Sequence, residues 1–400
     1  QHYKVEYKFS ATGEQTAAAR ENTLPHRGTL TMAPGILPFL LAALLSLRVS
    51  AAQSAVKAAY WFPESGFPVS GINAGLFTHL FCAFADVDPA SYRVTIATSK
   101  ASAFSTFTST VRRSNPSVAT LLSIGGGGNP PPAPTLAAMA SGAASRKAFV
   151  DSSIQAARSN GFSGLDLDWE YPRTATDMAN LVVLLREWRT AAAAEATRTG
   201  RTRLLLTAAV YYSSQLNSVD YPAGSIARNL DWINVMSYDY YTPSWRRVTS
   251  AHAALYDDSS QVSTSAGVGD WTSAGVPSRK IVMGIPFYGY AWTLLDPGNH
   301  GLGAPATNGT TGPGIAADGS VAYHDIRAFI QSSGATTVYD GDTVVDYCYA
   351  GTTWIGYVDV EAIDDMMTYA KDNGLLGYFA WSVSGDNNWT LSARAFSRWG

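Results

Sequence analysis

Three carboxylates alternate with apolar residues in one short stretch of this 400-residue chain. Asp166, Asp168 and Glu170 are each separated by one apolar residue within the run GFSGLDLDWEYP, which covers residues 161–172. In an extended strand, this spacing places all three acids on one face. Carboxylates so close together cannot all ionise cheaply, so at least one pKa should rise. A raised pKa is what a general acid needs if it works near neutral pH.

Two other interpretations of the acidic stretch are open. One is a solvated strand face, which the apolar neighbours and the helix stop at Asn160-Gly161 disfavour because they are typical of a buried parallel strand. The other is a metal site, since clustered carboxylates also hold divalent ions. None of the six histidines lies near the acids in sequence, which disfavours a mixed ligand set. We therefore expect neither a metal nor a cofactor.

The predicted elements that position these acids alternate regularly between strands and helices. From Val56 onward, short apolar runs alternate with longer amphipathic segments, which indicates repeated βα units and a parallel sheet. Strands are expected over residues 57–61, 78–85, 118–124, 164–169, 203–210, 232–238, 281–287 and 375–381. Amphipathic spacing predicts helices over 145–160 and 176–190, the second capped by Thr176. Eight such strands predict an α/β fold, the TIM (β/α)8 barrel, with its active site at the C-terminal strand ends.

The interval over residues 294–354 does not follow this alternation of strands and helices. It is too long for one crossover, is rich in Gly and Thr, and holds β-like runs at 336–339 and 343–347 and a helix candidate at 323–331. A structureless loop would not carry so many aromatic and aliphatic residues. We expect a small α+β insertion domain there, between strands seven and eight.

Several motifs accompany the acidic stretch at the ends of expected strands. They are SIGG at 123–126, MSYD at 236–239 and Trp381, which ends the last strand. Together with the acidic stretch they resemble glycoside hydrolase family 18, and most closely its plant class V chitinases. The acidic stretch matches the family pattern D-x-x-D-x-D-x-E, except that Ser163 stands in place of the first aspartate, and the two runs match the family's S-x-G-G and M-x-Y-D. The S-x-G-G and M-x-Y-D matches are weak alone, and a single Trp is more often a core residue, but all of the motifs fall in the family's order at the ends of expected strands. The resemblance covers residues 56–400.

The resemblance implies a retaining, substrate-assisted hydrolysis of β-1,4-linked N-acetylglucosamine. Glu170 would protonate the glycosidic oxygen, Asp168 would accept the N–H of the substrate's acetamido group, and Asp166 would hold Asp168. Tyr238 would bind the acetamido oxygen. The remaining positions implied to bind substrate are Tyr60, Phe84, Gly125, Gly126, Trp169, Met236, Asp239, Tyr288, Trp292 and Trp381. The family also carries an insertion domain in the interval noted above.

The overall composition narrows the range of partners. A formal net charge of −3 shows no basic excess, so we expect neither nucleic acid nor an anionic membrane surface as a partner. Aromatic residues make up 12% of the chain, which suits stacking against sugar rings but fits a large aromatic core equally well. Cys82 and Cys348 form no recognisable disulfide or metal motif, and we expect both to be buried thiols.

The N-terminal residues resemble a targeting segment. An apolar run over residues 33–47 is followed by small residues suited to signal-peptide cleavage. We expect residues 32–52 to be a secretory signal peptide and 1–31 to be an upstream extension of the reading frame; a long n-region is the alternative. The protein would then be secreted, to the extracellular space or the vacuole, and would be a glycoprotein with sequons at Asn308 and Asn388.

Together these observations favour a secreted chitinase that acts as a monomer on chitin or chitooligosaccharides. Two alternatives share the same barrel. One is an endo-β-N-acetylglucosaminidase that cuts N-glycan cores, and the other is a catalytically silent chitin-binding lectin or inhibitor. The presence of Glu170, Asp168 and Tyr238 speaks against a silent protein, because a lectin can lose its acid freely.

Overall fold

The computed structural model describes residues 54–128 and 130–400. The expected extension over 1–31 and the expected signal peptide over 32–52 lie outside the described residues. Within the described part, no helix combines the length and the apolar character needed to cross a bilayer. The same residues contain no group of three His, Cys, Asp or Glu side chains that could hold a metal ion.

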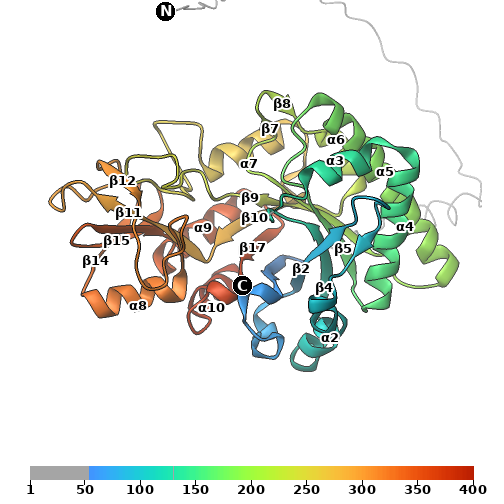
Figure 1. The fold of residues 1–400 in the computed structure, drawn as a ribbon, viewed down its shortest axis with the longest axis horizontal. Helices are drawn as coiled ribbons and strands as arrows, with labels where there is room; N and C mark the ends of the chain where they lie inside the picture. The colour runs from blue at the N-terminus through green and yellow to red at the C-terminus, as the bar shows by residue number, and fades with distance from the viewer. Residues whose placement is uncertain (1–53, 129) are drawn as a thin grey trace, which may run out of the picture. The chain divides into compact units, whose positions relative to one another are not determined.

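Eight parallel strands form a closed barrel (Figure 1). The first strand pairs with the second on one side and with the last on the other, so the sheet returns to its start. Every strand lies within two residues of its expected bounds at either end, which confirms the TIM barrel. In chain order the strands are β1 (Val56–Trp61), β2 (His79–Val87), β4 (Ala119–Gly125), β5 (Gly164–Asp168), β6 (Leu205–Tyr211), β9 (Trp232–Met236), β10 (Ile281–Pro286) and β17 (Gly377–Trp381).

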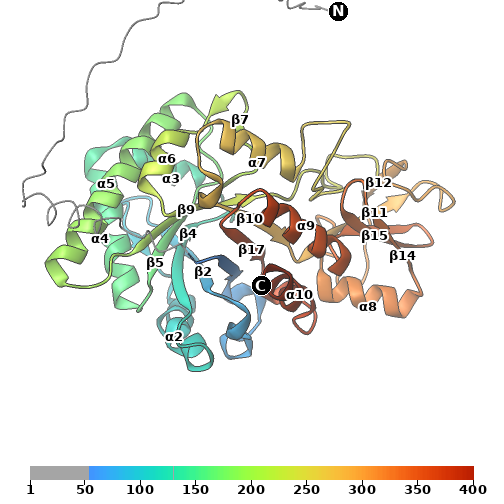
Figure 2. The same ribbon diagram turned by 180° about the vertical axis from the view of Figure 1, so that it is seen from behind.

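Helices surround the barrel, as the views from the front and from behind show (Figure 1; Figure 2). They are α2 (Thr98–Ser114), α3 (Ala133–Ser141), α4 (Ala143–Ser159), α5 (Ala175–Thr199), α6 (Ala223–Asn229), α7 (Thr264–Ser273), α9 (Val360–Asp372) and α10 (Thr390–Trp399). The connections between barrel elements also contain three two-residue strands, β3 (Val94–Thr95), β7 (Gln215–Leu216) and β8 (Val219–Asp220). Single 3-10 turns lie at Pro63–Ser65, Val69–Gly71, Ala74–Leu76, Ser278–Lys280 and Val383–Gly385.

Helix α5 starts earlier and ends later than the amphipathic pattern predicts. Its cap is Thr174 rather than the expected Thr176. The Thr174 hydroxyl accepts the N–H of Asp177 at 3.0 Å, and the Asp177 carboxylate accepts the N–H of Thr174 at 3.1 Å, which makes a capping box. The helix ends at Gly200, which adopts a left-handed conformation with φ 68°.

Strand alternation sorts the side chains of β5 between two cores. Leu165 and Leu167 face outward and belong to the large core beneath the helices. Asp166 and Asp168 therefore point into the barrel interior, where a second, smaller core includes Tyr60 of β1. The two expected thiols, at positions 82 and 348, are both free and buried.

The insertion between β10 and β17 is an α+β unit that lies beside the barrel (Figure 1). Its antiparallel sheet runs in the order β12-β11-β16-β15-β14, with β13 paired to β11. The elements are β11 (Tyr288–Leu294), β12 (Ala306–Gly309), β13 (Ser320–Ala322), α8 (Tyr323–Ser333), β14 (Thr336–Asp340), β15 (Val345–Ala350) and β16 (Thr353–Tyr357). The unit thus spans residues 288–357 and exceeds the expected interval of 294–354 at both ends.

Because the barrel closes between β17 and β1, we expect a side chain at Gly377 of β17 to destabilise the fold. A Cβ on Gly377 would lie 1.8 Å from the carbonyl oxygen of Val56, where β17 pairs with β1. We expect Gly377→Ala to lower the free energy of unfolding by about 1–3 kcal/mol or more, as measured by urea denaturation. Gly269→Ala is the matched control, because Gly269 lies inside α7 with nothing within 4 Å of its Cβ position. Equal stability of the two variants would contradict this account.

Candidate active site

Asp166 is fully buried inside the barrel, where hydroxyl groups hold its carboxylate. Tyr60 and Ser123 donate to Oδ2 at 2.9 and 2.7 Å, and Thr207 donates to Oδ1 at 2.6 Å. Asn234 supports the arrangement by donating to the Tyr60 oxygen at 2.8 Å. Burial raises the pKa of Asp166, although the hydroxyl donors partly oppose this effect. Tyr60, expected to contact sugar, is 1% exposed and contacts Asp166 instead.

Asp168 lies two residues further along the same face and is 4% exposed. Its Oδ1 is buried and has no hydrogen-bond partner among the described residues. Burial, followed by the charges of Glu170 and Asp166, raises the pKa of Asp168 well above its ordinary value. The expected hydrogen bond from Asp166 to Asp168 is not formed in the part of the chain that the structure describes. Asp168 therefore keeps a buried acceptor for a donor that enters the site.

Glu170 follows the end of β5 at the barrel mouth and is partly buried. Burial, and then the negative charge of Asp239, raises its pKa to about 7, against a hydrogen bond from Tyr171 that works to lower it. The carboxyl group lies close to the glycine-rich turn after β4, because a Cβ on Gly127 would be 3.2 Å from its Oε1. Below about pH 7 this group is mostly protonated, as a general acid must be.

The end of β4 comes so close to the acids that only glycine fits. A Cβ on Gly125 would lie 2.1 Å from the carbonyl oxygen of Asp168, and one on Gly126 would lie 2.7 Å from the ring of Phe84. Both glycines have positive φ, at 111° and 84°. Phe84 in turn stacks on Trp381 with ring centroids 5.7 Å apart. The motif at 123–126 thus joins the acidic strand to an aromatic surface.

Met236 and Tyr238 come from the end of β9. Met236 is 9% exposed and packs in the inner core, below the open part of the site. Tyr238 is half-buried, and Gly284 of β10 makes room for it, since a Cβ there would lie 2.8 Å from the tyrosine ring. Burial, followed by the charge of Asp239, raises the pKa of Tyr238 well above its ordinary value. Its hydroxyl therefore stays protonated and can donate a hydrogen bond.

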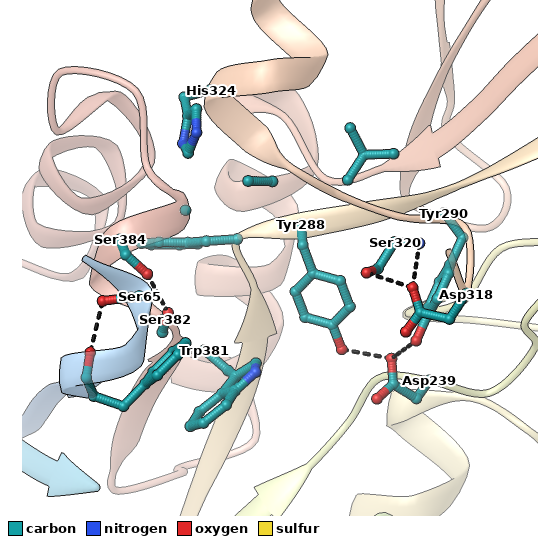
Figure 3. A pocket seen from close by; sticks show the side chains of 15 residues that line it. Ser65, Asp239, Tyr288, Tyr290, Asp318, Ser320, His324, Trp381, Ser382 and Ser384 are labelled. Atoms are coloured by element: carbon teal, nitrogen blue, oxygen red, sulfur yellow. Dashed lines mark hydrogen bonds between the residues drawn. The ribbon is translucent and has the colours of Figure 1, made fainter. Parts of the chain in front are cut away.

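Asp239 adopts a left-handed backbone conformation, with φ 60°, and its carboxylate faces β11. Tyr288 and Tyr290 donate to its Oδ1 at 2.5 and 3.1 Å (Figure 3). His252 Nδ1 lies 3.8 Å from the same oxygen. Burial works to raise the pKa of Asp239, but the imidazole and the two tyrosine hydroxyls outweigh it and hold the pKa below its ordinary value.

A cavity of about 410 Å³ extends from Asp239 and Trp381 to the insertion (Figure 3). Phe62 and Trp381 line its barrel side, with their rings stacked at a centroid distance of 5.4 Å. Asp318, Ser320 and His324 line its insertion side. Figure 3 shows Trp381 on one side of Tyr288, and Asp239, Asp318 and Ser320 on the other. Barrel and insertion therefore form two sides of one cavity.

The structure corrects the expected role of Trp169. Its indole is 3% exposed and packs with Leu167 and Leu185 in the layer between strands and helices. Alternation along the chain turns it away from the face that carries Asp168 and Glu170. It cannot contact a sugar in the barrel mouth.

Trp292 is also corrected. It lies on the same face of β11 as Tyr290, two residues further from the barrel, and is 0% exposed. Its ring packs at 5.5 Å from Trp354 inside the core of the insertion, and its N–H donates to the carbonyl of Arg246 at 3.3 Å. This indole supports the insertion instead of lining the cavity.

The sequence motifs mark none of four polar residues of the site, namely Thr207, Asn234 and His252 near the acids and Asp318 in the cavity. Thr207 and Asn234 had a detectable signal, because each is a polar residue at an inward position of an otherwise apolar predicted strand. His252 and Asp318 lie in irregular segments, where no periodicity marks the direction of a side chain.

Comparisons with known proteins agree with this geometry. Residues 54–386 match the model of glycosyl hydrolases family 18. The class V chitinase of Arabidopsis thaliana is 54% identical over 356 residues, which cover 89% of this chain and 92% of that protein. The class V chitinase of Nicotiana tobaccum has been crystallised as a Glu-to-Gln mutant in complex with NAG4. That structure is 51% identical to this chain and has a TM-score of 0.85. The match covers 87% of this chain and 99% of that one.

A third relative carries a different name. The chitinase-like agglutinin RobpsCRA of Robinia pseudoacacia has a TM-score of 0.81 and 49% identity, covering 86% of this chain and 100% of that one. The family match includes every carboxylate described above and most of the chain. With its closed barrel, its α+β insertion and its row of acids at the mouth, the chain belongs to glycosyl hydrolases family 18.

Proposed function

We propose that this protein hydrolyses the β-1,4 linkages of chitin or chitooligosaccharides with retention of configuration. The observation that carries the proposal is Glu170, a carboxylic acid whose pKa is raised to about 7 beside the buried carboxylate of Asp168. The choice of N-acetylglucosamine as the sugar is supported by the similarity to class V chitinases, one of them crystallised with NAG4.

In the first step, Glu170 donates its proton to the glycosidic oxygen as the bond between that oxygen and C1 breaks. The carbonyl oxygen of the substrate's own acetamido group forms a bond to C1 from the opposite face, which gives a cyclic oxazolinium ion. A raised pKa suits Glu170 for this role, because the carboxyl group is still protonated in mildly acidic solution.

Asp168 stabilises the cation that this step creates. Its buried Oδ1, unpartnered within the described residues, accepts the acetamido N–H, and its charge balances the oxazolinium. Burial raises the pKa values of Asp166 and Asp168, and the charges of Glu170 and Asp166 add to the effect at Asp168. Tyr238 donates its hydroxyl proton in a hydrogen bond to the acetamido oxygen and steadies it for attack.

In the second step, water attacks C1 from the face that the leaving sugar occupied. Glu170, which is now ionised, takes a proton from this water as the bond from C1 to the acetamido oxygen breaks. The new hydroxyl group lies on the same face as the original glycosidic oxygen, so the product keeps the β configuration. Glu170 ends the cycle protonated and ready for another substrate.

The insertion contributes a wall to the substrate groove. The cavity that begins at Asp239 and Trp381 continues between the barrel and the residues Asp318 and His324 of the insertion. Sugars remote from the cleaved bond would contact these side chains. Binding energy gained there can help to place or distort the reacting sugar.

A second candidate function is sugar binding without turnover. The observation that favours it is the 49% identity to the agglutinin of Robinia pseudoacacia. A lectin has no need of a carboxyl group held near neutral pKa at the mouth of the barrel, and Glu170 has that property. Hydrolysis therefore remains the first proposal, and turnover decides between the two.

Glu170→Gln tests the proposal directly. The amide fills the same space but cannot donate the proton, so hydrolysis of chitohexaose should fall at least ~10²-fold while binding is retained. Mass and anomer analysis of the wild-type products should give shorter oligomers in the β form. Glu187→Gln is the matched control, because Glu187 pairs with Arg146 outside the barrel. Near wild-type turnover by Glu170→Gln would refute the assignment, and an inactive wild-type protein that binds chitohexaose would favour the lectin.

Point variants test the groove wall better than deletion of the insertion does. Deletion would also remove Tyr288 and Tyr290, which donate hydrogen bonds to Asp239. Asp318→Ala combined with His324→Ala removes two exposed side chains from the cavity. We expect kcat/KM on chitohexaose to fall several-fold, at about 1 kcal/mol per lost hydrogen bond, with little change on a short chromogenic substrate. Equal losses on both substrates in a folded variant would refute the wall. Asp342→Ala, in an exposed turn of the same unit, is the control.

We also propose that the protein is secreted after removal of residues 32–52. The apolar run followed by small residues supports a signal peptide. Asn308 is exposed on the insertion and lies in an N-x-T sequon, which supports glycosylation there. N-terminal sequencing and mass spectrometry of the native protein should find a start near residue 53 and a glycan on Asn308. Recovery from the cytosol with Gln1 as first residue would contradict both expectations.

A further inference from the structure

His252 is a buried histidine that the proposed mechanism does not use. It lies between β9 and α7, its side chain is 2% exposed, and its ring packs against those of Tyr288 and Tyr290 at centroid distances of 5.2 and 5.1 Å. Neither ring nitrogen has a hydrogen-bond partner among the described residues. An unpartnered buried polar atom costs free energy, and phenylalanine would fill the space without that cost. The imidazole therefore requires an explanation.

The carboxylate of Asp239 is the group to which this imidazole is directed. Nδ1 of His252 lies 3.8 Å from Oδ1 of Asp239, the oxygen that also accepts the hydroxyls of Tyr288 and Tyr290. The titratable groups that face His252 are thus this carboxylate, from the turn after β9, and the two phenols of β11. Hydrogen bonds of catalytic groups are often long before the substrate binds and shorten in the complex.

Asp239 needs support from its neighbours because of its own conformation. Its φ of 60° lies in the left-handed region, which few residues with a side chain adopt. Its side chain is 47% exposed, so one side of the carboxylate faces solvent. The contacts that select one orientation all come from the other side, from Tyr288, Tyr290 and His252.

We propose that His252 is a positioning residue for the hydrolytic reaction, which donates its Nδ1–H to Asp239 and holds that carboxylate ionised and directed at the barrel mouth. The inference rests on the proposed function, because His252 acts on the chemistry only through Asp239 and Glu170. After burial, the charge of Asp239 is the main cause of the raised pKa of Glu170. His252 would thereby help to set the pH range in which the acid works.

His252→Phe tests this role, since it removes both ring nitrogens and keeps an aromatic ring against Tyr288 and Tyr290. The imidazole helps to lower the pKa of Asp239, so its loss should raise that pKa and let the carboxylate gain a proton at higher pH. We expect the acid limb of the kcat/KM profile on chitohexaose to move up by about 1 pH unit. A uniform loss of activity with an unmoved acid limb would show a structural role only and overturn the proposal.

His79→Phe is the matched control. His79 also packs its ring against an aromatic side chain, Trp232, at a centroid distance of 5.0 Å, but it lies at the start of β2, away from the strand ends that carry the acids. Its replacement should leave the acid limb where it is in the wild type. An equal shift in both variants would mean that any histidine packed against an aromatic ring has this effect, and would overturn the proposal.

A binding measurement separates this inference from the proposed function. In the Glu170→Gln background, which should bind without turnover, calorimetry compares the affinity for chitotetraose across pH with and without His252→Phe. We expect the affinity of the double variant to fall at a higher pH on the acid side. Identical pH dependence would overturn the role of His252 and leave the proposed function intact, whereas rapid hydrolysis by Glu170→Gln would refute the function itself. If His252→Phe fails to fold, His252→Leu replaces it with the same expected and refuting outcomes.

Discussion

The burial of carboxylates in one barrel interior is the constraint on which most of this structure depends. A carboxylate in a medium of low dielectric constant must be neutralised, hydrogen-bonded or protonated. Asp166 is satisfied by hydroxyls from the two neighbouring strands, β4 and β6, and from β1 across the barrel, so these strands carry polar residues at inward positions. Asp168 and Glu170 receive fewer partners, and the pKa rises well above its ordinary value for Asp168 and to about 7 for Glu170. The hydrogen-bonded acid thus lies inside the barrel, and the acids with fewer partners follow it toward the end of the strand.

The carboxylate of Asp239, which lies outside β5, also affects the protonation of the acids of that strand. Asp239 keeps a lowered pKa because tyrosine hydroxyls and an imidazole surround its carboxylate. Its negative charge then contributes to the raised pKa of Glu170. Opposite shifts in two nearby carboxyl groups allow one to remain ionised while the other holds a proton near neutral pH.

The barrel and the line of acids could be predicted from the sequence because both depend on short periodic patterns. Apolar runs marked the strands to within two residues, and a spacing of two placed Asp166 and Asp168 on the inner face. The same alternation turns the indole of Trp169 outward, whereas the family resemblance places it among the sugar-binding residues, and the structure follows the alternation. The approach of His252 to Asp239 could not be predicted, because it depends on the path of an irregular segment folding back over the barrel.

The strand β11 shows why the insertion cannot be regarded as a separate module. Its side chains at alternate positions form a row of rings, with centroid distances of 5.8 Å from Tyr288 to Tyr290 and 6.2 Å from Tyr290 to Trp292. The row begins at the carboxylate of Asp239 and ends in the core of the insertion beside Trp354. An insertion exchanged between relatives would bring its own row of rings, and with it a new electrostatic environment for the acid. Preference for substrate length and dependence on pH would therefore be inherited together.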